Sequence, residues 1–394
     1  MVVREIVERV YYVGVPHHDR RLFDALIPLP DGTSYNAYLI KDEKTVLIDT
    51  VDPMKEKELL HNLETAGVDR IDYIVSNHTE QDHSGAIPTL LELYPEAKVV
   101  TNPKCRELLQ HHLHIPEHRF ITVQDGDRIS IGSMTLEFII APWVHWPDTM
   151  FTYLKEKRIL FTCDFLASHL ASGGLFVEDE AVLYNAAKRY YAEIMMPFRR
   201  FVSKHLERVT KLEIDIIAPS HGPLHNRPEF ILNLYQEWCS EDVKNAVVMP
   251  YVSMHGSTEN MAKHLAERLA EQGVEVRMFN LTVTDLGSLA MALIDAATLV
   301  LATPTVLSGP HPLAVYATYL VNALRPKLRF ASILCSYGWG GKTLEIVKDM
   351  LRYMPNLKFL TPVIVRGLPD KEDYARIDKL ADEIVEKHKQ ITGG

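Results

Sequence analysis

From about residue 246 onward, the chain alternates strictly between short apolar segments and helical segments. Five strands are predicted, the first over AVVMPYV (246–252) and the last over LKFLTPVIVRG (357–367), and a final helix starts near Lys371. Such alternation predicts a parallel sheet that is covered by helices on both faces. Residues 246–394 are therefore expected to form one doubly wound α/β domain.

Residues 1–245 follow a different pattern. Short apolar or alternating runs, such as TVLIDT (45–50) and RILFTCDF (158–165), are bounded by Gly, Asp, Asn and Pro and are typical of strands. Helical patterns interrupt them, including a long one over residues 182–209. Meandering strands mixed with helices predict a sheet sandwich with helices outside. A short charged join near residues 241–245 separates the two predicted domains.

Composition excludes several classes of function. The chain has 42 Lys and Arg against 52 Asp and Glu, a formal net charge of −10 without a basic run, which disfavours binding to nucleic acid or to an acidic membrane. No apolar stretch approaches the roughly 18–20 residues of a membrane span, and the N-terminus is not a secretory signal. The four cysteines are far apart and form no C-x-x-C pair, which excludes a cysteine-ligated zinc or iron site and predicts a cytoplasmic location.

Potential metal ligands are concentrated in the first domain, where 14 of the 18 histidines lie. The predicted strand IDYIVSNH runs directly into a loop that carries His78, Glu80, Asp82 and His83. A polar loop with a helix cap is the alternative interpretation. A hydrophobic core, however, has no need for four ligand-type side chains within six positions. The loop therefore predicts a metal site.

Three further predicted strands end in ligand-type residues, namely His145, Asp164 and His221. Each follows an apolar run, so each is expected where a buried strand emerges, at a common edge with the loop. Four imidazoles and three carboxylates are too many for one tetrahedral ion. They fit two ions that share a bridging carboxylate, and two histidines with carboxylates and open positions suit ferrous iron that meets O₂ or a similar small molecule.

The order H-x-E-x-D-H at residues 78–83, followed by a later His, Asp and His-Gly, resembles the metallo-β-lactamase superfamily. Its zinc hydrolases usually carry His at the third motif position, where this chain has Glu80. With the second domain added, the chain is similar to the flavodiiron proteins, cytoplasmic enzymes that reduce O₂ to water, NO to N₂O, or both. The resemblance implies a metallo-β-lactamase-like αββα sandwich (1–245), a flavodoxin-like five-stranded domain (246–394), FMN and two non-haem iron ions.

The resemblance also implies the site residues. One iron would be held by His78, Glu80, His145 and Asp164, and the other by Asp82, His83 and His221, with Asp164 bridging and with His83 at a position that is not a ligand in every member. Tyr191 and Phe198 match aromatic residues near the family's metal pocket, although their spacing also fits a helix core. Asp24 stands where some members carry a histidine over the irons, and His169 lies either beside the ligands or at the surface.

Three loops of the second domain are expected to bind FMN. The first loop, residues 253–260, is rich in small and hydroxyl residues where a helix begins. This composition favours phosphate binding, and the loop resembles the flavodoxin phosphate loop. The other two loops, residues 303–312 and 336–341, follow the carboxyl ends of strands, where parallel sheets bind ligands. His255 replaces a common aromatic residue, and Pro250 is expected near the end of its strand. The expected contacts are Ser253, Met254, His255, Gly256, Ser257, Thr258, Thr303, Pro304, Thr305, Ser336, Tyr337, Gly338, Trp339, Gly340 and Gly341.

The implied function is an oxidoreductase, with O₂ and NO both open because the iron ligands would be the same. No rubredoxin or flavin-reductase segment follows the second domain, so an external donor is expected, rubredoxin by family resemblance. The family also implies a head-to-tail homodimer, alone or within a tetramer, in which each FMN lies beside the partner's irons. The alternatives are a dizinc hydrolase, against which Glu80 argues, and an electron carrier with a vestigial metal site, against which the complete ligand set argues.

Overall fold

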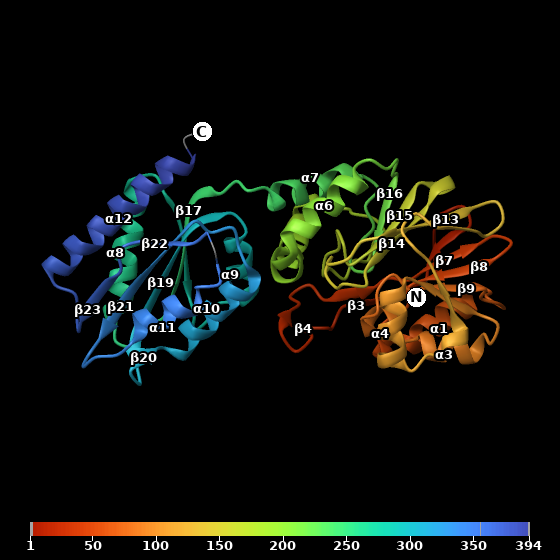
Figure 1. Cartoon of the computed structure of the whole chain (residues 1–394), viewed down its shortest axis with the longest axis horizontal. Helices are drawn as coiled ribbons and strands as arrows, with labels where there is room; N and C mark the ends of the chain where they lie inside the picture. Colours follow the sequence, from red (N-terminus) through yellow and green to blue (C-terminus); the bar gives the residue numbers. More distant parts are fainter. Residues whose placement is uncertain (1–2, 355, 393–394) are drawn as a thin grey trace. The chain divides into compact units, whose positions relative to one another are not determined.

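The computed structural model describes residues 3–354 and 356–392, which form two compact units (Figure 1). The first unit ends at Cys239 and the second begins at Ser240. Strand β17 (Lys244–Tyr251) opens the sheet of the second unit, and its Lys244 pairs with Ala296 of β19 (Ala296–Val306). Residues 240–245, which the sequence pattern assigns to the first domain, therefore belong to the second unit.

Two large sheets form the centre of the first unit, one of seven strands and one of five. In sheet order, the larger has β1 (Arg4–Val7), β2 (Val10–Tyr12), β7 (Tyr38–Lys41), β8 (Thr45–Ile48), β9 (Tyr73–Val75), β10 (Lys98–Thr101) and β11 (Phe120–Thr122). The smaller has β12 (Arg128–Ser130), β13 (Thr135–Ile140), β14 (Met150–Leu154), β15 (Ile159–Cys163) and β16 (Ile216–Pro219). Two short pairs are separate, β3 (Val15–His17) with β6 (Thr33–Tyr35) and β4 (Leu22–Phe23) with β5 (Ile27–Pro28).

Strand alternation divides the core of this unit into layers, because successive side chains point to opposite faces. On β7, Leu39 packs with the helices α1 (Glu56–Thr65), α3 (Ile87–Leu93) and α4 (Pro103–Leu113), whereas Ile40 packs with Phe138 of the smaller sheet. The outer face of the smaller sheet meets α6 (Arg199–Val209), where the ring of Phe151 lies 6.3 Å from that of His205. The expected αββα sandwich is confirmed.

The helical pattern over residues 182–209 is not one helix. Helix α5 (Glu180–Tyr190) is followed by a π-helical turn (Tyr191–Met195) and a 3₁₀ turn (Met196–Phe198) before α6 begins. Pro197 explains the break, because proline has no N–H for a helical hydrogen bond and its ring clashes with the preceding turn. The π turn changes which side chains face inward after Tyr190. Helix α7 (Pro228–Cys239) ends the unit.

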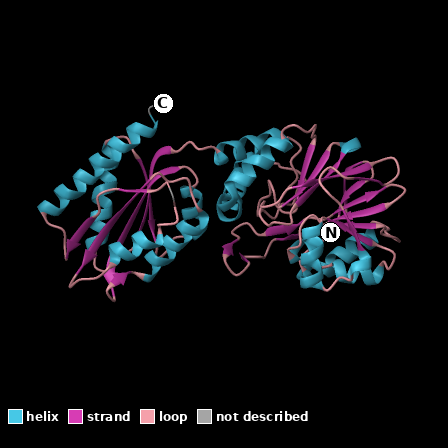
Figure 2. Cartoon of the chain, in the orientation of Figure 1, coloured by secondary structure: helices cyan, strands magenta, loops and turns pink. Residues whose placement is uncertain are grey.

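The second unit is a five-stranded parallel sheet with helices on both faces (Figure 2). The neighbours of β17 and β19 are β18 (Glu275–Asn280), β21 (Phe330–Tyr337) and β22 (Lys358–Phe359) in the order β18-β17-β19-β21-β22. One face packs against α8 (Ser257–Glu271) and α12 (Lys371–Thr392), and the other against α9 (Leu286–Leu293), α10 (Pro312–Leu324) and α11 (Thr343–Met350). The expected flavodoxin-like, doubly wound architecture is confirmed.

Two prolines shape this sheet. Pro250 is the last residue but one of β17 and pairs with Phe279 of β18, near the strand's carboxyl end as expected. The last predicted strand is two short strands, β22 and β23 (Val363–Arg366), which both pair with β21. Pro362 lies between them and lacks the N–H that a continuous ladder needs.

Within the described ranges, no helix combines the length and the apolar character that crossing a membrane requires. The longest, α12, begins with the charged run Lys371, Glu372 and Asp373.

Candidate metal centre and flavin site

The seven predicted metal ligands come together at the ends of strands from both sheets of the first unit. His78 and Glu80 lie in the loop after β9, and Asp82 and His83 lie in the short helix α2 (Gln81–Ser84). His145 lies in the loop between β13 and β14, Asp164 directly follows β15, and His221 follows β16. The strands are rigid and hold the start of each loop in place. The loops that follow them can therefore direct all the ligands toward one position.

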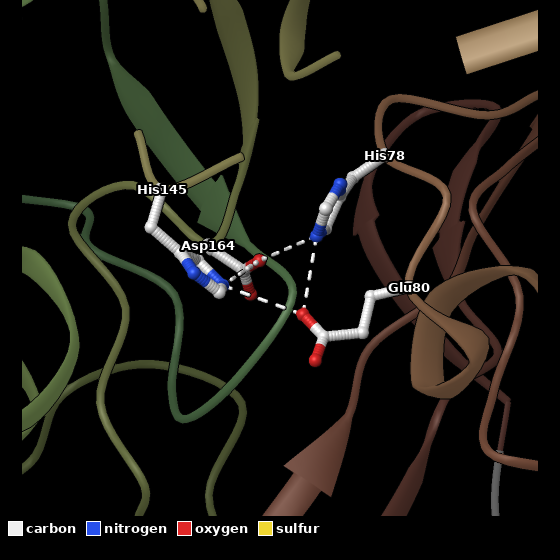
Figure 3. A group of neighbouring side chains, drawn as sticks. All are labelled: His78, Glu80, His145 and Asp164. Atoms are coloured by element: carbon white, nitrogen blue, oxygen red, sulfur yellow. Dashed lines mark hydrogen bonds and ion pairs between the residues drawn. The ribbon is translucent and has the colours of Figure 1, made fainter. Parts of the chain in front are cut away.

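One group of ligands consists of His78, Glu80, His145 and Asp164, whose side chains point toward one another (Figure 3). The Nε2 atoms of His78 and His145 lie 3.2 and 3.3 Å from Glu80 Oε2. The same nitrogens lie 3.6 and 3.4 Å from Asp164 Oδ2. Two imidazoles and two carboxylates at these distances can enclose one metal ion, and the donor set suits iron.

The other group consists of Asp82, His83 and His221, all buried. His221 Nε2 lies 3.2 Å from Asp82 Oδ2, and His83 Nε2 lies 3.4 Å from Asp82 Oδ1. The side chain of His83 therefore points into the site.

Asp164 faces both groups with different oxygens. Its Oδ2 faces His78 and His145, whereas its Oδ1 lies 3.0 Å from His83 Nε2 and 3.4 Å from His221 Nε2. This is the arrangement that a carboxylate bridging two metal ions requires. The side chain is 2% exposed, so the bridging position is shielded from bulk solvent.

The unsatisfied polar atoms of the site fit bound cations. Among the described residues, none donates a well-oriented hydrogen bond to either carboxylate oxygen of Asp82 or to Asp164 Oδ2, although all three atoms are buried. A buried carboxylate without donors is costly, and a metal ion removes that cost. The residues present therefore fit two divalent ions.

The carboxylates also make the site attractive to positive charge. Burial lowers the pKa of His145, but the neighbouring carboxylates of Asp164 and Glu80 outweigh it and raise the pKa to about 9. His221 follows the same pattern, with burial opposed by Asp164 and Asp82, and its pKa is raised to about 10. Bound metal ions would supply the positive charge that the buried carboxylates attract, in place of these protons.

The tyrosine beside the metal ligands is Tyr190, not the predicted Tyr191. The Tyr190 hydroxyl donates to Asp164 Oδ1 over 3.1 Å. Tyr191 begins the π turn, and its hydroxyl instead donates to the backbone carbonyl of Trp238 on α7. The expectation for Tyr191 is thus corrected, and its packing against Trp238 fits the helix-core interpretation. The adjacent tyrosines in RYYAE could not be distinguished without the register of α5.

The other two predicted neighbours lie near the ligands. The Phe198 ring lies 6.5 Å from that of His145. His169 is buried rather than at the surface, with Nδ1 2.9 Å from Thr33 Oγ1 and its ring 4.8 Å from that of His221. Burial and the neighbouring His221 lower the pKa of His169 well below its usual range, so this imidazole is neutral.

A cavity of about 250 Å³ opens beside the ligands and reaches Glu80 and Asp82. Asp24 lines it, together with Phe23 and Trp146. The Asp24 side chain therefore lines the same cavity as Glu80 and Asp82. Burial and the neighbouring Glu80 carboxylate raise the pKa of Asp24 to about 6.

A second cavity, of about 430 Å³, lies at the carboxyl ends of the strands in the second unit. Most of the predicted flavin contacts line it, namely Ser253, Met254, His255, Ser257, Thr258, Pro304, Thr305, Ser336, Tyr337, Gly338 and Trp339. Gly367 and Leu368, which follow β23, also line it and were not predicted. Their position after a strand is the signal that could have identified them, since β23 ends at the same edge as β21.

Four predicted contacts are not in the lining of this cavity. Gly256 precedes α8 with a φ of +87°, a conformation that glycine adopts without strain. Thr303 is buried, and its hydroxyl donates to the carbonyl of Pro304. Gly340 and Gly341 lie behind Trp339 in the loop, and a Cβ on Gly341 would lie 2.4 Å from Thr305 Cγ2. These residues shape the loops instead of lining the cavity.

The flavin cavity fits a phosphate-bearing, partly apolar ligand. The N-terminus of α8 opens into it at Ser257, and Ser253 Oγ accepts a hydrogen bond from Gly256 N–H at 3.2 Å, which fixes the loop. Thr258 Oγ1 lies 2.8 Å from Ser336 Oγ and joins the first loop to the third. The lining contains no acidic side chain, so nothing in it repels a phosphate. Trp339 is 79% exposed and available for stacking.

Comparison with known proteins places the chain in one family. The model of the ODP family beta lactamase matches residues 33–222. A nitric oxide reductase of Moorella thermoacetica is 34% identical over 96% of this chain and 97% of its own. A coenzyme F420H(2) oxidase of Methanothermobacter marburgensis is 34% identical over 88% of this chain and 89% of its own.

A solved structure has the same fold throughout. Rubredoxin oxygen:oxidoreductase from Desulfovibrio gigas matches 100% of this chain and 100% of its own with a TM-score of 0.96 and 28% identity. The similarity therefore extends over both units and both candidate sites. The chain belongs to the flavodiiron protein family of oxidoreductases.

Proposed function

We propose that this chain reduces O₂ to water, NO to N₂O, or both, at a non-haem diiron centre, with electrons that arrive through FMN. The observation that carries the proposal is Asp164, which faces two groups of buried ligands with one carboxylate oxygen toward each. A bridged pair of redox-active ions suits reaction with a small molecule such as O₂. A hydrolase would have no use for the flavin-sized cavity of the second unit.

The residues divide the work. One iron would be held by His78, Glu80, His145 and Asp164, and the other by Asp82, His83 and His221, with Asp164 bridging. Bound iron would exchange electrons with the substrate and FMN would supply them, four for O₂ to become two waters and two for two NO to become N₂O and water. The cavity beside Glu80 and Asp82 would admit a diatomic substrate, and Tyr190 would hold its hydroxyl proton at Asp164 Oδ1.

The electron donor is proposed to be rubredoxin. The supporting observation is the full-length likeness to rubredoxin oxygen:oxidoreductase. The relative named as a coenzyme F420H(2) oxidase provides a second donor to be tested beside it. Reduced rubredoxin and coenzyme F420H₂ should therefore each be supplied with O₂ and, separately, with NO. A donor that reduces the FMN and supports turnover identifies the physiological class of reductant.

The assembly is proposed to be a head-to-tail homodimer in which the FMN of one chain serves the irons of its partner. One variant without irons (His78→Ala with Asp164→Ala) and one with weakened FMN binding that is purified free of flavin (Ser257→Glu) should each be inactive. After subunit exchange, mixed dimers should regain part of the activity because one complete cross-subunit pair is present. Mixed dimers that form but stay inactive would favour electron transfer within one chain.

The proposed function is tested by composition and then by turnover. Protein from iron-replete cells should contain about two iron ions and one FMN per chain. After chemical reduction under anaerobic conditions, it should consume O₂, NO or both when each gas is added separately. Zinc at both positions, together with no reaction with either gas, would rule the proposal out in favour of a hydrolase.

A further inference from the structure

Asp148 is a buried carboxylate that lies behind the metal ligands and outside their motif. It follows His145 in the loop between β13 and β14, and its side chain is completely buried. Its Oδ2 and Oδ1 lie 3.1 and 3.2 Å from His78 Nδ1. The Thr79 backbone N–H donates to the same carboxylate over 2.8 Å, and the Thr79 hydroxyl donates over 2.7 Å. His78 therefore contacts Asp148 with one ring nitrogen and the metal position with the other.

The position of Asp148 is itself fixed from two sides. Asn102 Nδ2 donates to the Asp148 carbonyl over 2.6 Å, while Asn102 Oδ1 caps α4. The Trp146 ring lies edge-on to His78 with a centroid distance of 5.0 Å. Asn102 thus connects the Asp148 backbone to the start of α4, and Trp146 packs against the His78 imidazole that Asp148 contacts.

This contact selects one tautomer of His78. A carboxylate beside Nδ1 accepts a hydrogen bond from that nitrogen, so Nδ1 carries the hydrogen and Nε2 keeps its lone pair. Nε2 is the atom that faces Glu80 Oε2 at 3.2 Å and Asp164 Oδ2 at 3.6 Å. The geometry therefore matches a carboxylate–histidine–metal triad, in which the carboxylate orients the imidazole toward the metal position.

The two histidines of the other ligand group lack an equivalent partner. The Nδ1 atom of His221 lies 2.6 Å from the neutral backbone carbonyl of Ser34. His83 Nδ1 is buried and has no hydrogen-bond partner among the described residues. An ionised acceptor donates more electron density through the ring than a carbonyl does. Of these three histidines, His78 is therefore the one whose Nδ1 contacts a carboxylate directly.

We propose that Asp148 is a positioning residue that holds His78 in the Nδ1–H tautomer and, through its negative charge, makes His78 a stronger electron donor than His83 and His221. This rests on the proposed diiron function. The consequence is a lower reduction potential for the iron bound by His78, because added negative charge favours the more oxidised ion. Electrons would then leave this iron more readily than its neighbour.

The test is an anaerobic redox titration of the iron-loaded protein, with the iron and FMN potentials read separately by EPR and absorbance. The variant is Asp148→Asn, which keeps the shape but removes the charge. The matched control is Asp42→Asn, because the Asp42 side chain is only 4% exposed and lies in the same unit, but bonds to Arg9 and Ser133 instead of a histidine. In Asp148→Asn the first iron potential should rise by about 59 mV, a tenfold shift for one electron. Its FMN potential and the Asp42→Asn iron potential should stay unchanged.

A second variant decides the matter if Asp148→Asn does not fold. Thr79→Val removes the hydroxyl that donates a hydrogen bond to the Asp148 carboxylate. The negative charge of Asp148 then interacts more strongly with His78. The iron potential should therefore fall, opposite in sign to the effect of Asp148→Asn. An unchanged or higher potential in Thr79→Val would overturn the proposal, as would an Asp148→Asn protein that keeps two irons at the wild-type potential.

Failure of the wider function has a different signature. If the wild-type protein binds no iron, or binds only zinc, the diiron function fails before any potential is measured. If the wild-type protein binds two irons and turns over but Asp148→Asn leaves its potential unchanged, only the role of Asp148 is wrong.

Discussion

The Tyr190 hydroxyl lies 3.1 Å from Asp164 Oδ1, the oxygen that also faces His83 and His221. Tyr190→Phe removes this donor but leaves every predicted metal ligand in place. We expect turnover to fall roughly 10-fold or more, since hydrogen bonds to charged groups contribute about 1.5–3 kcal/mol. Iron content should remain unchanged, and both quantities are measured on the same preparation.

Tyr191→Phe is the matched control for this prediction. It removes the same atom one residue further along the chain, where the hydroxyl bonds to the carbonyl of Trp238. Activity should therefore stay close to that of the wild type. Equal losses in the two variants would mean that the hydroxyl of Tyr190 acts only through packing.

Asp164→Ala should remove more metal than any single histidine change. Asp164 contributes one oxygen to each group of ligands, whereas each imidazole belongs to one group. Both metal affinities should fall by at least ~10–100-fold, the range known for weaker supporting contacts. His221→Ala should spare the group of His78, Glu80 and His145. Metal analysis that finds two irons in Asp164→Ala would exclude a bridging role.

Ser257→Glu should weaken FMN binding through the phosphate alone. Ser257 begins α8 and lines the flavin cavity, so a carboxylate there opposes a phosphate at the helix N-terminus. FMN affinity of the flavin-free protein should fall at least ~10-fold, whereas riboflavin, which lacks the phosphate, should bind as before. The measurement is a fluorescence titration with both flavins, and equal losses for the two would place the phosphate elsewhere.

His388 makes the second unit sensitive to acid. It is buried on α12 between Thr298 Oγ1 and Asn245 Oδ1, each 2.7 Å away, and burial lowers its pKa to about 4. The unfolded histidine binds a proton near pH 6.5 and the folded one does not. Stability is therefore complete above pH 6.5 and falls by roughly 2 kcal/mol as the pH drops toward 4.

The control for this prediction is His388→Gln, which cannot titrate. Chemical unfolding should be followed between pH 7 and pH 4.5 by the fluorescence of the second unit. The wild type should lose more stability than His388→Gln over that interval. Parallel pH dependences would show that folding does not lower the pKa of His388.

The sequence predicted a site residue correctly where that residue directly follows a strand that is itself recognisable as an apolar run. Each metal ligand follows an apolar run, so the position of His145, Asp164 and His221 at strand ends could be predicted from local pattern alone. The same rule found most of the flavin cavity. It could not separate Tyr190 from Tyr191, because that choice depends on a π turn before Pro197.

Residues that act through other residues were also beyond the sequence. Asp148 stands in the loop PWVHWPDTM without a strand or helix pattern, and its contact with His78 spans two sheets. Gly367 and Leu368 were missed although the last strand was predicted to end at residue 367, because only the ends of three other strands were assigned to the flavin. Long-range pairing, not local propensity, places all three.

The central claim is that electrons pass from FMN to a diiron centre that reduces a small molecule. It is tested most directly by mixing fully reduced protein with one equivalent of O₂ per chain in a stopped-flow instrument, with absorbance followed at the flavin band and hydrogen peroxide assayed afterwards. We predict that FMN is reoxidised within the same reaction that consumes O₂, without peroxide, and that Asp164→Ala abolishes this fast phase. Stoichiometric peroxide, with flavin reoxidation equally fast in Asp164→Ala, would contradict the claim.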